Sequence, residues 1–200
     1  MKKKLLLSLL LCTGLLLTGC SSGETAQTNE SDNSSESALA NQQENSQTDI
    51  AEPEQESAIP GSYTVPDGWV KSDEHSSANM VFYVEEGHEE DALPDNISIS
   101  VGANRYSAEE HTKFKDAITK QLLMQLNGAD AQLEGSGSNT EQGYVVYIFT
   151  IDDATAVTKQ YYIVKDYGFC LVQLTNFTGS DNAYQAAQTI VDSFVWNDEE

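Results

Sequence analysis

The sequence predicts an α+β domain in which a mostly antiparallel sheet of about six to eight strands is sandwiched by two amphipathic helices. Three observations predict this fold class. Short stretches of strand-like alternation stand on both sides of a helix-like segment. Two connections between such stretches are only about three or four residues long, which forces antiparallel pairing. A second helix-like segment follows the last strands, and residues 60–200 are predicted to form a single domain.

In the first half of this domain the sequence predicts four extended segments. They span residues 62–65, 69–72, 79–84 and 96–103, and the turn Pro66-Asp67-Gly68 separates the first two. In the fourth segment Ile97, Ile99 and Val101 alternate with small polar residues, so one face of that strand is expected to be buried.

A helix is predicted next, because Ser107-Ala108-Glu109-Glu110 matches a capping box and Gly128 provides a stop signal. Apolar residues recur at helical spacing between them, at Phe114, Ala117, Ile118, Leu122 and Leu126. This apolar stripe is expected to pack against one face of the sheet.

The second half predicts four more strands and the final helix. The strands span residues 131–134, 144–151, 156–165 and 169–175, with turns at Asp152-Asp153 and Asp166-Tyr167-Gly168. Segment 144–151 is apolar on both faces and is expected to be central, whereas Gly135-Ser136-Gly137-Ser138 is expected to be a flexible loop. The helix begins at Ser180 or Asp181, and its apolar stripe comprises Ala183, Ala186, Ala187, Ile190, Val191 and Phe194.

Residues 1–19 have the anatomy of an export signal: three lysines, an apolar run from Leu5 to Leu17 and a small-residue cleavage stretch. The tetrapeptide Leu17-Thr18-Gly19-Cys20 resembles the bacterial lipobox. This resemblance implies diacylglyceryl transfer to Cys20 and cleavage between Gly19 and Cys20. We therefore expect a lipoprotein that the lipid holds on the extracytoplasmic face of the cell membrane.

Residues 20–59 are expected to form a disordered tether behind the lipidated cysteine, because the stretch after Cys20 has nine acidic residues, no basic residue and no aromatic residue. Beyond the signal the chain has seven basic and 32 acidic residues, a net charge of −25. Such a charge repels phosphate backbones and anionic headgroups, so nucleic-acid binding is not expected.

The domain resembles the PsbP-like superfamily in three stretches. These are Tyr63-Thr64-Val65-Pro66-Asp67-Gly68-Trp69, Ile97-Ser98-Ile99-Ser100-Val101 and Ile190-Val191-Asp192-Ser193-Phe194. The resemblance implies an α/β/α fold and a non-enzymatic adaptor or assembly role. It transfers no functional residue, since none of these stretches is a catalytic motif.

One acidic cluster is a candidate site between two predicted strands. It comprises Glu85, Glu86, Glu89, Glu90, Asp91 and Asp95. Clustered carboxylates suit hard cations, so the cluster is interpreted as a weak divalent-cation site, a docking patch for a basic partner, or a solvated loop. Its spacing does not match an EF-hand.

The sequence contains no recognisable catalytic motif. The three histidines are isolated, so no metal or cofactor site is expected. Cys170 lies in an apolar run and is interpreted as a buried structural thiol. In the pairs Tyr144/Tyr147 and Tyr161/Tyr162 one member of each is expected to be exposed, as in a contact surface.

The expected function is a non-catalytic module that binds another envelope protein. The competing hypotheses are a solute-binding lipoprotein and a small envelope hydrolase. The hydrolase would combine Asp152 and Asp153 with His88 or His111.

Overall fold

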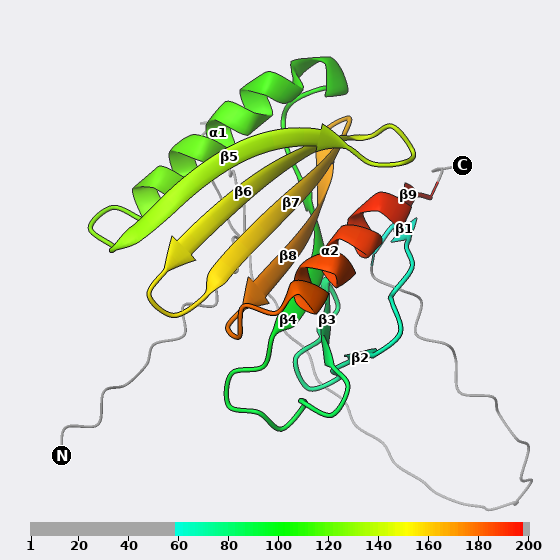
Figure 1. Ribbon diagram of the computed structural model, residues 1–200. Coiled ribbons are helices and arrows are strands. Elements are labelled where there is room, and N and C mark those ends of the chain that lie inside the picture. Colours follow the sequence, from blue (N-terminus) through cyan, green and yellow to red (C-terminus); the bar gives the residue numbers. More distant parts are fainter. Residues whose placement is uncertain (1–58, 198–200) are drawn as a thin grey trace, which may run out of the picture. The chain divides into compact units, whose positions relative to one another are not determined.

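The computed structural model describes residues 59–197. Seven strands form one sheet in the order β2-β3-β4-β8-β7-β6-β5, and every neighbouring pair is antiparallel (Figure 1). The strands are β2 (Trp69–Lys71), β3 (Met80–Glu85), β4 (Asn96–Ala103), β5 (Ala131–Asn139), β6 (Val145–Asp153), β7 (Val157–Lys165) and β8 (Gly168–Asn176). The helices are α1 (His111–Gln125), preceded by the 3-10 turn η1 (Ala108–Glu110), and α2 (Asp181–Ser193). The predicted α+β class with a mostly antiparallel sheet and two amphipathic helices is confirmed.

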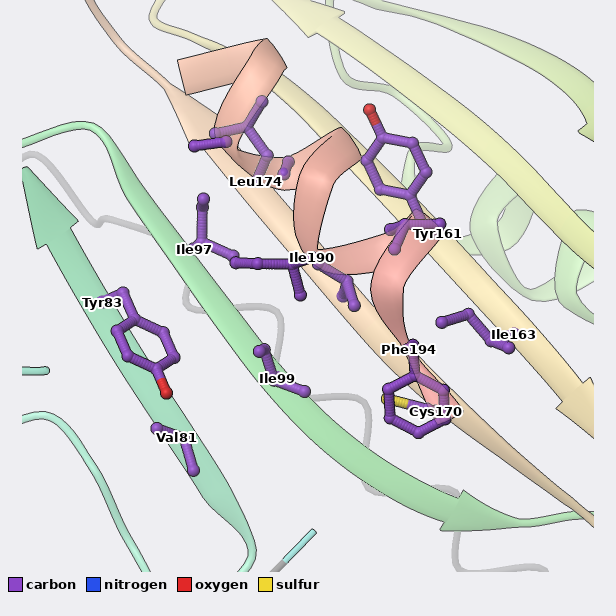
Figure 2. Close-up of a cluster of buried hydrophobic side chains, with 14 of the residues drawn as sticks. Val81, Tyr83, Ile97, Ile99, Tyr161, Ile163, Cys170, Leu174, Ile190 and Phe194 are labelled. Carbon is purple, nitrogen blue, oxygen red and sulfur yellow. The ribbon is translucent and has the colours of Figure 1, made fainter. Parts of the chain in front are cut away.

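Helix α2 packs on one face of the sheet, above β4, β7 and β8. Its Ile190 and the following Phe194 are fully buried against strand residues that include Ile97, Ile99 and Cys170 (Figure 2). The helix contributes alanines at three more buried positions, so its backbone approaches the strands closely. This cluster contains the alternating apolar residues that the sequence predicted for β4.

Helix α1 packs on the opposite face of the sheet. Phe114, Ile118 and Leu122 are its buried residues, and they join a cluster with Phe149, Tyr162 and other strand residues. Adjacent residues of β7 divide between the two clusters, because successive side chains of a strand point to opposite faces. Ala117, predicted in the buried stripe, is exposed instead, since it lies just beyond the edge of the contact.

The predicted N-cap role of the Ser107 side chain is wrong. The Ser107 hydroxyl makes no capping hydrogen bond, and α1 begins only at His111, after η1. The backbone N–H of Ala108 donates instead to the Asp166 carboxylate, from the turn between β7 and β8. The side chain of Asp166, distant in sequence, therefore caps the N-terminal end of η1.

Two predictions about the sheet are also wrong. Segment 144–151 corresponds to β6, which begins at Val145 and lies next to the edge strand rather than at the centre. Both faces of β6 are apolar because the sheet is covered on both sides even there. The central strand is β8. The expected loop Gly135–Ser138 is strand instead, since β5 continues to Asn139 and pairs with β6 along its whole length.

The ends of the described chain meet in a separate two-stranded sheet. Strand β1 (Gly61–Ser62) pairs with β9 (Val195–Trp196), so only the beginning of the expected 62–65 strand is strand. A Cβ atom on Gly61 would lie 2.5 Å from the Phe194 ring, so the backbone passes directly over that ring. Glycine is therefore required at this crossing.

Candidate functional site

The acidic cluster lies on the loop that connects β3 to β4, at the end of the sheet where α2 begins. Glu86, Glu89, Glu90 and Asp91 are exposed, and Leu93 exposes 43% of its surface beside them. The loop carries no lysine or arginine. It therefore presents a negatively charged surface with one accessible large apolar side chain.

Asp95 does not belong to this exposed surface. It is only 4% exposed, and its carboxylate accepts hydrogen bonds from the backbone N–H groups of Phe177 and Thr178, at 2.6 and 3.0 Å. The Thr178 hydroxyl donates a third hydrogen bond to it. Charge-assisted hydrogen bonds of this kind are strong, so Asp95 attaches the end of the loop to the connection between β8 and α2.

Glu85 fixes the other end of the loop. Its carboxylate accepts a hydrogen bond from the side-chain amide of Asn182, in the first turn of α2, at 2.9 Å. The backbone N–H of Glu86 donates to the carbonyl of Gly68 at 2.8 Å. Both ends of the acidic loop are thus attached to neighbouring elements.

Within the loop, His88 pairs with Asp91. Their side chains are joined by a 2.7 Å hydrogen bond, which, together with the charge of Asp91, raises the pKa of His88. Gly87 adopts a φ of 85°, where glycine is favoured, and allows the turn. The backbone is therefore locally organised between its two attached ends.

The acidic cluster is not assembled as a ligand set for a cation. Among residues 59–197, no group of three or more His, Cys, Asp or Glu side chains is arranged to hold a metal ion. Asp95 is directed to backbone donors and Glu85 to Asn182, so two of the six carboxylates are already engaged away from the exposed four.

His111 and the Asp152–Asp153 pair of the hydrolase hypothesis do not converge, and His88 is paired with Asp91. The Asp153 carboxylate accepts hydrogen bonds from the backbone N–H groups of Thr155 and Ala156 and closes the β6–β7 turn. His111 bonds the hydroxyl of Tyr147, whose ring packs on the α1 side of β6. Asp152 lies five residues along β6 from Tyr147, roughly 16 Å away, and its side chain points to the other face.

The prediction for Cys170 is confirmed, whereas the prediction for Tyr161 and Tyr162 is wrong. Cys170 is a buried free thiol, as predicted, and burial raises its pKa. Tyr161 and Tyr162 are both buried, one in each cluster, so the expectation that one would be exposed is wrong. The reason is that both faces of β7 are covered by helices.

The predicted cleavage and lipidation residues, Gly19 and Cys20, lie outside the described residues. In residues 59–197, neither helix has the length and apolar character needed to cross a membrane.

Sequence reasoning missed the contributions of Asn182 and Leu93 to this site. Asn182 is 97 residues from its partner Glu85, so no local pattern could have connected them. Leu93 had a weak signal, as the one large apolar side chain of the loop.

Comparisons with known proteins found no matching family model and no matching curated protein. Among solved structures, the chain is similar to cyanobacterial PsbP (CyanoP) from Synechocystis sp. PCC 6803, with a TM-score of 0.42 and 14% identity over 74% of this chain and 97% of that one. It is also similar to a protein from Bacteroides thetaiotaomicron VPI-5482, with a TM-score of 0.40 and 14% identity over 72% of this chain. The match spans 47% of that second protein, about half its length.

Proposed function

We propose that this chain is a lipoprotein anchored through Cys20 on the extracytoplasmic face of the cell membrane, and that it displays a non-catalytic, PsbP-like α/β/α module for binding or assembly. The partner is a basic protein of the cell envelope. The observation that carries the proposal is the acidic loop, which is attached at both ends and exposes four carboxylates beside Leu93.

The acidic loop is pre-organised for binding. A loop whose ends are already fixed loses less conformational freedom on binding than a free acidic segment does. Its charge accelerates encounter with a cationic surface, and Leu93 adds apolar area that can be buried. A basic partner therefore suits this loop, whereas nucleic acids and anionic lipids are repelled.

The docking part is tested by placing a photo-cross-linking residue at Glu89 in the full-length chain and irradiating intact cells. The matched control is Tyr167, which is 62% exposed and lies at the opposite end of the sheet. We expect a reproducible adduct with a basic protein from position 89 and not from position 167. Identical adducts from both positions, or none, would contradict the proposal.

A charge variant distinguishes docking at this loop from non-specific electrostatic binding. Glu86→Gln, Glu89→Gln and Glu90→Gln together remove three exposed charges without touching Asp95 or Glu85. In the control variant the three changes are made outside the loop, at the exposed Glu109, Asp130 and Glu141. Loss of the adduct is expected in the loop variant alone, and a weaker adduct in both would indicate only a net-charge effect.

The anchor is tested separately with Cys20→Ser. This change removes the thiol that would carry the lipid, so we expect loss of acyl labelling and release of the chain from the membrane fraction. A Cys12→Ser control should retain both properties. Persistent labelling of Cys20→Ser would overturn the anchor assignment.

A further inference from the structure

Strand β5 is a free edge of the sheet. It pairs with β6 over nine residues, and no strand among residues 59–197 lies on its other side (Figure 1). Such an edge presents unpaired backbone N–H and C=O groups to another chain. The other edge strand, β2, has only three residues and presents far fewer.

The usual protections of an edge are missing from β5. It contains no proline and no lysine, and Glu134 is its one charged residue. Seven of its residues are exposed, from Glu134 to Asn139 and at Gln132. The strand is therefore long and accessible.

Neither a close contact nor a positive φ requires glycine at two positions of β5, Gly135 and Gly137. A Cβ atom on Gly135 would lie 3.5 Å from the Phe149 ring, and one on Gly137 would lie 3.7 Å from the Tyr147 ring, both ordinary contacts. Neither glycine has the positive φ found at Gly128. Glycine weakens a strand and can mark close approach of another backbone, which agrees with the free edge.

The helix behind this edge also exposes apolar surface. Leu123 and Met124 of α1 are 57% and 62% exposed. Lys115 lies over the Tyr147 ring of β6. Leu123 follows it by eight residues, a rotation of about 80° around the helix, and lies towards the solvent-facing side of α1.

Charge is nearly balanced on α1, beside this edge, although not on the edge strands themselves. Residues 59–197 carry seven basic and twenty acidic side chains, but residues 105–127, which include α1, carry four basic and three acidic ones. Two copies with the same strong negative charge repel each other least where the local charge is close to neutral. Helix α1 meets that condition, whereas residues 130–153, which include β5 and β6, carry five acidic residues and no basic one, so pairing at this edge requires screening of charge by salt.

We propose that β5 pairs antiparallel with β5 of a second copy of this chain, about a two-fold axis through Gly135. This register places Glu134 opposite the partner's Ser136 and Leu133 opposite the partner's Gly137, so no like charges meet. The two sheets become continuous, and both α1 helices lie on the same face of the joined sheet. The proposal is independent of the function proposed above.

The register makes a charge test possible. Ser136 is exposed on β5, so Ser136→Lys and Ser136→Glu leave the core unchanged. In the dimer Ser136→Lys brings lysine opposite Glu134 twice, whereas Ser136→Glu brings two carboxylates together twice. From the strength of cross-strand charge pairs we expect the dimer Kd to fall roughly two- to thirtyfold with lysine and to rise by a similar factor with glutamate.

The measurement is sedimentation equilibrium on residues 21–200, the whole chain beyond the predicted lipid site. Added salt should strengthen the wild-type dimer, because it screens the repulsion between two copies that each carry a charge of −25. A monomer at all concentrations would overturn the proposal. A dimer that both Ser136 variants leave unchanged would do so too, since it must use another surface.

Cross-linking tests the register directly. Gly135→Cys places two thiols opposite each other at the two-fold axis, whereas Gln132→Cys places them about 20 Å apart. The native Cys170 is buried and does not interfere. Under mild oxidation we expect a covalent dimer from Gly135→Cys alone. Equal yields from both variants, or a higher yield from Gln132→Cys, would refute this register.

Discussion

The Asp95 carboxylate accepts a 2.6 Å hydrogen bond from the backbone N–H of Phe177, 82 residues further along the chain. This bond joins the start of β4 to the connection between β8 and α2. It places the acidic loop beside the first turn of α2, where Asn182 holds Glu85. The buried Asp95 carboxylate thus holds the candidate site in place against the central part of the sheet.

Replacing Asp95 with alanine should destabilise the domain. The change leaves two backbone N–H groups without their acceptor, and we expect a loss of roughly 2–4 kcal/mol in the free energy of unfolding. Urea denaturation followed by circular dichroism measures this. Asp91→Ala, an exposed neighbour, should cost less than about 0.5 kcal/mol. Equal effects of the two changes would contradict the assigned role.

Glycine is required at position 102 and not at position 137. A Cβ atom on Gly102 would lie 2.4 Å from the Phe169 ring, which packs against Phe114 and Tyr162 and has little room to move. We expect Gly102→Ala to lower the free energy of unfolding by about 1–3 kcal/mol. Gly137→Ala should change it by less than about 1 kcal/mol in the monomer. Thermal unfolding of both variants, at concentrations where the chain is monomeric, checks the difference.

The thiol of Cys170 should be unreactive in the native protein. Burial raises its pKa, and the thiolate is the reactive form, so a disulfide reagent should modify it only after unfolding. Its reaction rate then reports opening of the α2 side of the core. A Gln132→Cys thiol on the exposed edge should react at once under the same conditions. Rapid native-state modification of Cys170 would show that this part of the core is open.

Tyr161 should make stability decline at high pH. Burial raises its pKa to about 12, above the ordinary value of about 10 in an unfolded chain. Its favourable contribution is therefore complete below about pH 10 and is lost as the pH rises towards 12. Denaturation midpoints measured across this range should fall, and Tyr161→Phe should make the fall smaller. An unchanged slope in Tyr161→Phe would assign the loss to other groups, such as Tyr63, whose pKa burial also raises.

Local patterns were sufficient for the elements that have one dominant periodicity. Alternation at Ile97 and Ile99 predicted a strand with one buried face, and helical spacing of Ile190 and Val191 predicted the face that α2 buries. Short connections predicted antiparallel pairing in the second half of the domain. These features depend on residues close together in the chain, which is why sequence alone indicated them.

Local patterns failed where distant residues compete with near ones. Asp166 caps η1 in place of Ser107, and β6 supplies the partner that turns the glycine-serine segment into strand. The Tyr161 and Tyr162 pair was misjudged because the position of α1 on the second face has no signal within β7. In each case the deciding contact comes from another part of the chain.

The sequence by itself determined the fold class, most of the strands and the buried state of Cys170, and it predicts export and lipid attachment at Cys20. Only the tertiary structure decided which acidic residues are free. It separates the buried Asp95 and the tied Glu85 from the four exposed carboxylates, and it leaves β5 at an open edge. The physical reason is that burial and strand order depend on contacts between distant segments, whereas propensity and turn chemistry are properties of neighbours.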